Sequence, residues 1–220
     1  MGAAILICSS AAAENLFVSG SYAGQTAQTG VIFEITPDGA QSTFALGLSD
    51  PIGLAFDSAG NLFVAESGSG SILKFTPGAV RTTFASGLSG PVGLAFDRAG
   101  NLFVTDGDDI VGPGHANIYK VTPSGHITVF TRGLTAILGV VFDGRDRMYV
   151  LETSTAAGDP TPFTGKVIRV DPSGHQTEIA SGLFFPTGIT FGPDGALYVS
   201  NVGFGPPPVG MGEILRITVP

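Results

Sequence analysis

The chain has 220 residues and a formal net charge of −8 at pH 7, and 43% of its residues are hydrophobic. An apolar fraction of this size is typical of a chain that buries a core, and it excludes a disordered protein. The 33 glycines and 15 prolines interrupt the sequence too often for an all-helical fold. Its ten Lys and Arg residues are scattered, which argues against binding to nucleic acid.

Residues 1–13 allow two interpretations. They contain a short apolar run, Leu6–Cys8, followed by small residues, so they are either the remnant of a secretion signal or the first inner strand of the fold. No basic residue precedes the apolar run, which favours the strand. Cys8 is the single cysteine, so we expect neither an internal disulfide nor a cysteine-based zinc site. No apolar run is long enough to predict a membrane-spanning helix.

A repeat follows. Residues 51–66 recur as residues 91–106, and both copies contain the phrase Pro-x-Gly-Leu-Ala-Phe-Asp-x-x-Gly-Asn-Leu-Phe-Val. Further copies span residues 137–152 and 186–201, and the first unit keeps only part of the pattern. Each copy contains two strand-like runs and is followed by another pair, so each unit has four expected strands, here called a to d. The predicted units are approximately 5–50, 51–90, 91–135, 136–185 and 186–220, and the last stops after strand c.

Four-stranded units of this length are the signature of a β-propeller, in which each sheet packs against its neighbours on both faces. The sequence therefore predicts an all-β, single-domain β-propeller of five four-stranded units over residues 1–220. Consistent with two buried faces, Leu102–Val104 is apolar at successive positions. Crowding of the innermost strands explains the glycines at the start of strand a, namely Gly53, Gly93, Gly139 and Gly188. One aromatic position in strand b is expected in the core, namely Phe17, Phe63, Phe103, Tyr149 and Tyr198.

The repeated phrase resembles the NHL-repeat and SMP-type β-propeller superfamily over nearly the whole chain. More narrowly, Gly182–Asn201 followed by the Gly- and Pro-rich Gly203–Pro208 is similar to bacterial propellers of the ScyD/ScyE type. This resemblance implies an extracytoplasmic protein, either periplasmic or secreted. Members of that family generally have six blades, so the resemblance leaves open a five-bladed propeller and a six-bladed one that lacks its N-terminal blade. The first would be a monomer, and an incomplete ring would associate through its uncovered faces.

The lengths of the connections indicate where a ligand binds. The a-to-b and c-to-d turns are short, whereas the b-to-c loops are long at residues 20–30, 107–116, 153–165 and 202–212. Insertions on one face of a repeat protein usually mark its binding face. We therefore expect this face to bind a protein, a glycan or a small ligand. Its candidate ligand residues are Asp108, Asp109, His115, Asp159 and Phe204.

Oxygen-bearing side chains end strand b in four units: Glu66, Asp106, Glu152 and Asn201. Together they could bind Ca²⁺ or another divalent cation, which takes oxygen ligands. The alternative, which the residue types favour, is that each side chain accepts backbone N–H bonds and shapes the adjoining loop.

Two functions remain open at this point. The gluconolactonase-like branch of SMP-type propellers has a metal-binding Asn or Asp between the proline and glycine that open strand a, but here those positions hold Ile52, Val92, Leu138 and Thr187. The leading hypothesis is a non-enzymatic scaffold, with or without a bound cation. The alternative is a metal-dependent hydrolase or lyase that uses the four residues at the ends of strand b and His115. A third interpretation is a fragment without independent activity.

Overall fold

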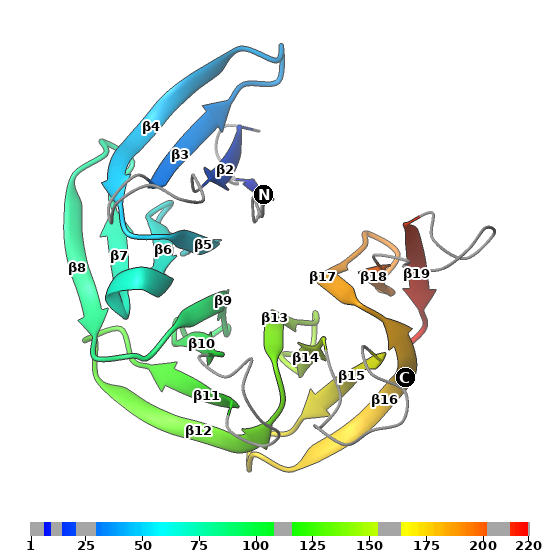
Figure 1. Cartoon of the computed structure of the whole chain (residues 1–220). Helices are drawn as coiled ribbons and strands as arrows, with labels where there is room; N and C mark the ends of the chain where they lie inside the picture. Colours follow the sequence, from blue (N-terminus) through cyan, green and yellow to red (C-terminus); the bar gives the residue numbers. More distant parts are fainter. Residues whose placement is uncertain are drawn as a thin grey trace. The chain divides into compact units, whose positions relative to one another are not determined.

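The computed structural model describes residues 7–9, 15–20, 30–107, 116–153, 164–201 and 212–219, and strands account for most of them (Figure 1). In these ranges the strands form five sheets in chain order, four of four strands and a last one of three. Neighbours in the sequence are neighbours in each sheet, and the recorded pairs are antiparallel. The sheets are the blades of a β-propeller, which confirms the predicted all-β fold and its five repeat units.

The strands have the following bounds. The first blade contains β1 Ile7–Ser9, β2 Leu16–Gly20, β3 Gly30–Ile35 and β4 Gln41–Leu48. The second contains β5 Pro51–Phe56, β6 Leu62–Glu66, β7 Ser71–Phe75 and β8 Arg81–Ser86, with the short 3-10 helix η1 Ser67–Ser69 after β6. The third contains β9 Pro91–Phe96, β10 Leu102–Asp106, β11 Ala116–Val121 and β12 Ile127–Leu134. The fourth contains β13 Ile137–Phe142, β14 Met148–Glu152, β15 Thr164–Val170 and β16 Gln176–Phe184. The last contains β17 Pro186–Phe191, β18 Leu197–Asn201 and β19 Glu213–Ile217.

An aspartate closes the turn between the first two strands of a blade. In the β5–β6 turn, Asp57 Oδ1 accepts hydrogen bonds from the backbone N–H groups of Ala59 and Asn61, at 2.9 and 2.8 Å. Its Oδ2 accepts a third from the Asn61 side chain at 2.7 Å. Gly60 has a φ of 78°, a conformation that glycine adopts without steric cost. The phrase Asp-x-x-Gly-Asn is therefore the sequence of a tight hairpin turn.

Aromatic side chains of the second strand pack between blades. Phe63 makes edge-to-face contacts with Phe84 of its own blade and Phe96 of the next, at ring-centroid distances of 4.9 and 5.0 Å. Phe17 and Phe103 have the same kind of surroundings. The predicted core position is confirmed for Phe17, Phe63, Phe103 and Tyr149, which are all buried. Tyr198 differs, because it is only partly buried and its hydroxyl donates to Asp194 Oδ2.

The glycines that open strand a are required by close approach of the next blade. A Cβ on Gly53 would overlap the carbonyl oxygen of Val92, and one on Gly139 would lie 2.7 Å from Ile189 Cγ2. Any side chain at these two positions would force neighbouring strands apart. The crowding predicted from the repeat is therefore confirmed at Gly53 and Gly139.

The chain divides into two compact units. One consists of Met1–Leu102 with Val121–Ile127, and the other of Phe103–Lys120 with Thr128–Pro220. Each has its own apolar cluster, centred on residues such as Ile32 and Val64 in the first and Leu151 and Leu197 in the second. Among the described residues, no helix has the length and apolar character that crossing a membrane requires.

Candidate functional site

The four side chains predicted as cation ligands each end the second strand of a blade. Glu66, Asp106, Glu152 and Asn201 are the last residues of β6, β10, β14 and β18, and all are 5% exposed or less. Within the described ranges, no three His, Cys, Asp or Glu side chains are grouped so that they could hold a metal ion. The metal site therefore stays a prediction, and the four side chains differ in their surroundings.

Both carboxylate oxygens of Glu66 have hydrogen-bond or ion-pair partners. Its Oε1 accepts the backbone N–H of Ser49 at 2.9 Å and lies 3.6 Å from the Arg81 guanidinium. Its Oε2 accepts the hydroxyl of Ser69 at 2.9 Å. Ser49 precedes strand β5, and Ser69 lies in the b-to-c connection. The carboxylate thus joins the segment that enters the blade to the b-to-c connection.

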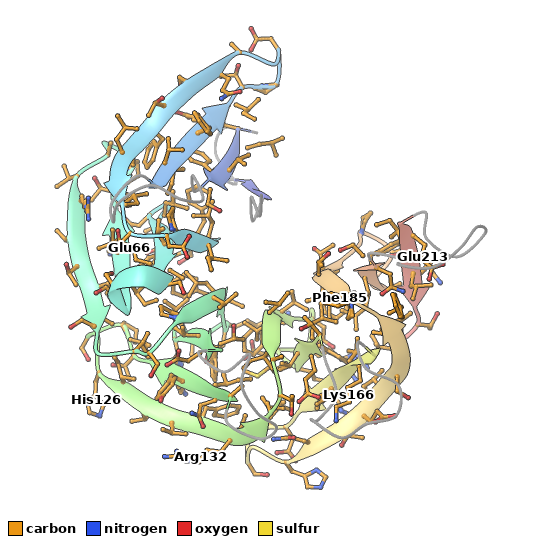
Figure 2. The ribbon with its side chains drawn as sticks, viewed as in Figure 1. Glu66, His126, Arg132, Lys166, Phe185 and Glu213 are labelled. Carbon is orange, nitrogen blue, oxygen red and sulfur yellow. The ribbon has the colours of Figure 1, made fainter. Side chains whose placement is uncertain are left out.

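Glu152 repeats this arrangement in the fourth blade. Its Oε1 accepts the backbone N–H of Thr135 at 2.8 Å, and its Oε2 lies 3.1 Å from Lys166 Nζ. Lys166 is the cross-strand neighbour on β15 and is labelled in Figure 2. Burial raises the pKa of the Glu152 carboxyl, and the bonds from Thr135 and Lys166 oppose that effect only in part.

The backbone beside Glu66 and the backbone beside Glu152 also form equivalent hydrogen bonds. Ala136, with a φ of 44°, accepts the N–H of Thr153, the residue after Glu152, at 3.0 Å. Asp50, with a φ of 50°, likewise accepts the N–H of Ser67, the residue after Glu66. A positive φ is strained for residues other than glycine, and the surrounding bonds must compensate for it. The carboxylate and the two backbone segments therefore form one hydrogen-bonded corner, which supports the loop-shaping interpretation for Glu66 and Glu152.

Asn201 occupies the same position but has different partners. Its Nδ2 donates to Glu213 Oε1 at 3.0 Å, and Glu213 is its cross-strand neighbour on β19 (Figure 2). Its Oδ1 is buried and accepts no hydrogen bond from the residues that the structure describes. A buried acceptor without a protein donor is uncommon, and a water molecule, a cation or a ligand can serve as its partner. The end of β18 therefore has an excess of acceptor oxygens, from Asn201 and Glu213, whereas at the end of β14 the Glu152 carboxylate is neutralised by Lys166.

The remaining predicted site residues are less informative. Asp106 is buried at the end of β10 and has an interaction partner. Asp108, Asp109, His115, Asp159 and Phe204 lie outside the residues that the structure describes. The prediction that they face a ligand therefore stays untested.

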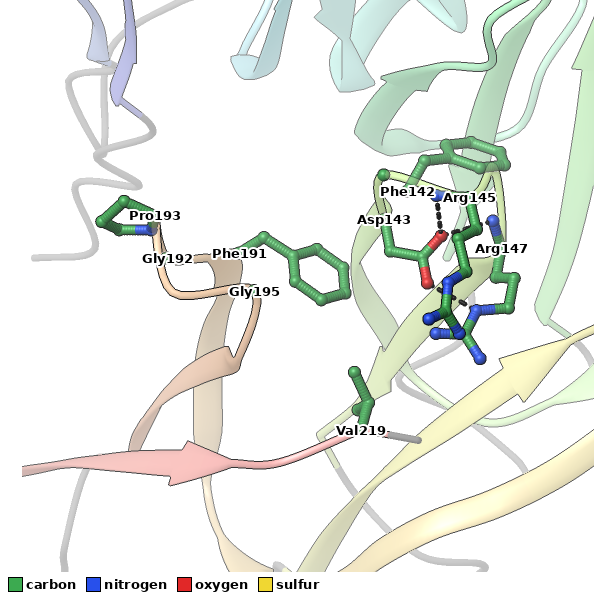
Figure 3. A pocket seen from close by; sticks show the side chains of 10 residues that line it. Phe142, Asp143, Arg145, Arg147, Phe191, Gly192, Pro193, Gly195 and Val219 are labelled. Atoms are coloured by element: carbon green, nitrogen blue, oxygen red, sulfur yellow. Dashed lines mark hydrogen bonds and ion pairs between the residues drawn. The ribbon is translucent and has the colours of Figure 1, made fainter.

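A cavity that the sequence did not reveal lies at the opposite end of the blades. It has a volume of about 360 Å³ and lies between the β13–β14 and β17–β18 turns, both in the second unit (Figure 3). Its lining residues come from those two turns and from the segment after β19: Phe142, Asp143, Gly144, Arg145, Arg147, Phe191, Gly192, Pro193, Gly195 and Val219. The only sequence signal was the pair of arginines, which stand where the β5–β6 turn has Ala59 and Asn61.

The electrostatics of this cavity depend on the β13–β14 turn. Asp143 accepts the backbone N–H of Arg145 at 2.8 Å and that of Arg147 at 2.9 Å, and it is paired with Arg147 Nε at 2.5 Å. Burial disfavours its charge, but these bonds outweigh burial and lower the pKa of the Asp143 carboxyl. Asp143 is thus ionised and committed to its own turn.

Comparisons with known proteins bear on the fold. No family model matches the chain, and no curated protein is similar to it in sequence. Among solved structures, an inactive variant of virginiamycin B lyase from Staphylococcus aureus, in complex with quinupristin, is similar with a TM-score of 0.65 and 18% identity. The match covers 99% of this chain and 71% of the lyase.

Two further solved structures are similar to a comparable degree. A nidogen/laminin complex matches with a TM-score of 0.70 and 19% identity, over 90% of this chain and 72% of the other. The PQQ-bound aldose sugar dehydrogenase from Streptomyces coelicolor matches with a TM-score of 0.65 and 18% identity, over 80% of this chain and 62% of the enzyme. At such low identity these likenesses establish a β-propeller fold, and they leave activity open.

Proposed function

We propose that the protein is a non-enzymatic β-propeller scaffold that binds a protein, a glycan or a small ligand on the face with the long b-to-c loops. The observation that carries this proposal is the bonding of Glu66 and Glu152. Each carboxylate is occupied by a backbone N–H and a basic side chain, and so it anchors the base of a loop instead of offering free ligand atoms. Loops on a rigid support are a common way to build a binding face.

The narrower parts of the proposal rest on sequence. The resemblance of residues 182–208 to ScyD/ScyE-type propellers supports an extracytoplasmic location, periplasmic or secreted. Solved propellers of similar fold include a nidogen/laminin complex, in which a propeller protein is part of a protein complex. The binding role is therefore in keeping with what this fold supports elsewhere.

The second candidate function is that of a metal-dependent hydrolase or lyase. It is favoured by one observation: the buried Asn201 Oδ1, beside the Glu213 carboxylate, accepts no hydrogen bond from any described residue. Two such oxygens would suit Ca²⁺ or another hard divalent cation. The lyase among the similar structures shows that this fold can support catalysis, although 18% identity carries no residue roles across.

Metal content measured by mass spectrometry on dialysed protein separates the two functions. The scaffold proposal expects no stoichiometric ion and the same thermal unfolding with EDTA as with added Ca²⁺. A stoichiometric ion with a melting temperature that follows free metal, as mass action requires, would support the enzyme instead. In that case Asn201→Ala should abolish the metal-dependent shift, whereas Glu178→Ala, on the exposed face of β16, should leave it unchanged.

Binding itself is tested with a glycan and peptide array. Asp159→Ala and Phe204→Ala, in two of the long loops, should each weaken a detected interaction, while Arg98→Ala in the short β9–β10 turn should not. Equal effects of all three changes, or no binding by folded protein, would overturn the proposed role of the loop face.

A further inference from the structure

The β13–β14 turn departs from its counterparts in a way that hairpin formation does not need. The β5–β6 and β9–β10 turns read Asp-x-Ala-Gly-Asn, whereas the β13–β14 turn reads Asp143-Gly144-Arg145-Asp146-Arg147. Asp146 takes the glycine position at a φ of 65°, a conformation that aspartate adopts more readily than most non-glycine residues. Arg145 stands where the other two turns have alanine. The fold does not require this arginine, because alanine serves in both other turns.

Arg145 is available to a ligand. Its backbone N–H is bonded to Asp143, but across the described residues its guanidinium has no acidic partner within salt-bridge distance. Arg147 is different, because its Nε is paired with Asp143 Oδ2. Figure 3 shows the two arginine side chains together on one side of the cavity. With two arginines and one aspartate, the lining has a formal charge of +1 in a chain whose net charge is −8.

The wall of the cavity opposite the two arginines is apolar, and its side chains pack against the core. The Phe191 ring points across the space toward the β13–β14 turn, and Val219 lies below it (Figure 3). The Phe191 ring makes an edge contact with the buried Tyr149 of β14, at 5.4 Å between ring centroids. Val219 packs against the same apolar cluster. The cavity therefore has a cationic side and a hydrophobic side, both supported by the blade core.

We infer that this cavity binds a small organic carboxylate whose body is aromatic, with Arg145 as the residue that recognises the carboxylate. A guanidinium presents a planar pair of donors that matches a carboxylate, and charge-assisted bonds of this kind are among the stronger ones. An aromatic ring would pack against Phe191 and Val219. A cavity of about 360 Å³ is at the lower end of the range for small-molecule sites, in agreement with a ligand of one ring. This site lies at the opposite end of the blades from the proposed loop face and does not depend on it.

The test uses phenylacetate and its uncharged analogue phenylacetamide as probes, titrated into the full chain and followed by NMR chemical-shift changes. Phenylacetate should bind more tightly than the amide by about tenfold, the effect of one charge-assisted hydrogen bond. Arg145→Ala should remove that preference, and the alanine is compatible with the turn because Ala59 occupies the same position. Arg98→Ala, which removes an arginine from the β9–β10 turn, is the matched control and should bind as the parent does.

A second variant tests the apolar wall of the cavity. Val219→Asp places a carboxylate on the wall facing Arg145. It should weaken binding of phenylacetate more than that of phenylacetamide, because both rings lose an apolar contact and only the acid is repelled. Thermal unfolding of each variant establishes that it is folded. Equal binding of acid and amide, unchanged affinity in Arg145→Ala, or no binding of phenylacetate to folded protein would each overturn the inference. These outcomes leave the proposal for the loop face unaffected, since none of the variants alters a b-to-c loop.

Discussion

The ends of β14 and β18 occupy one repeat position and yet differ in their electrostatics. At the end of β14, an acid faces a cross-strand base, and Glu152 gains both Lys166 and the backbone N–H of Thr135. At the end of β18, an amide faces a cross-strand acid, and Asn201 is left with a buried acceptor. The comparison shows that one position can hold a structural corner in one blade and an unsatisfied group in the next. Unsatisfied groups are candidates for ligand binding, whereas satisfied groups are candidates for stability.

The largest expected effect comes from removing the satisfied carboxylate. Glu152→Ala should lower the free energy of unfolding by about 2 kcal/mol, because the Thr135 N–H loses its acceptor and Lys166 loses its partner. Urea unfolding measures this loss. Glu178→Ala, at an exposed site on β16, is the control and should change stability by less than about 0.5 kcal/mol. If both variants lose the same amount, the corner does not stabilise the blade.

A smaller effect should appear in the pH dependence. Burial raises the pKa of Glu152 above its ordinary value of 4.5, so the folded state holds this proton more tightly than the unfolded chain. The resulting stability is fully present below 4.5 and is lost as pH rises through the folded pKa. Glu152→Gln does not titrate, so stability of the parent relative to this variant should fall as pH rises above 4.5.

Asp143 is the control for this measurement, because its contribution to stability should depend on pH with the opposite sign. Its pKa is lowered, since hydrogen bonds from its own turn outweigh burial. The stability it contributes is present above its unfolded pKa of about 3.8 and is lost as pH falls through the folded pKa. Stability of the parent relative to Asp143→Asn should therefore rise with pH over the acidic range. Identical slopes for the two variants would contradict the assigned pKa directions.

Removing the unsatisfied side chain should have less effect. Asn201→Ala loses a hydrogen bond to the exposed Glu213 but also removes a buried acceptor that has no donor. The two contributions oppose each other, so the free energy of unfolding should change by less than about 1 kcal/mol. A loss as large as that of Glu152→Ala, measured in the same urea series without added metal, would mean that Asn201 is structural after all.

The smallest effect concerns the backbone of the corner. Ala136 has a φ of 44°, which costs an L-residue about 1–2 kcal/mol, whereas glycine in that conformation costs only its extra unfolded-state entropy. Ala136→Gly should therefore stabilise the chain by about 0.5 kcal/mol, seen as a higher melting temperature. Ala180→Gly, in strand β16, should instead destabilise it. A lower melting temperature for Ala136→Gly would show that the corner is not strained.

Much of the fold could be predicted because its signals are local. The turn Asp57–Asn61 closes within five residues, and the buried run of β6 is apolar over most of its length. The candidate positions Glu66, Glu152 and Asn201 were also found, since they recur in the repeat. Their partners were not, because Ser49 and Thr135 are 17 residues from the carboxylates they bind. The cavity was missed for the same reason, because Arg145 and Val219 come to line one cavity only through the packing of two blades.

The sequence by itself determined the five repeat units of this chain and the strands within them, because turn residues and apolar runs act over a few residues and need no distant partner. It also determined which position in each blade would bear a polar side chain at the end of strand b. Only the tertiary structure decided which of these side chains is neutralised and which has an oxygen without a hydrogen bond from the described part of the chain. The physical reason is that the satisfaction of a buried polar group depends on donors from neighbouring strands and corners, and a repeat pattern does not specify those donors.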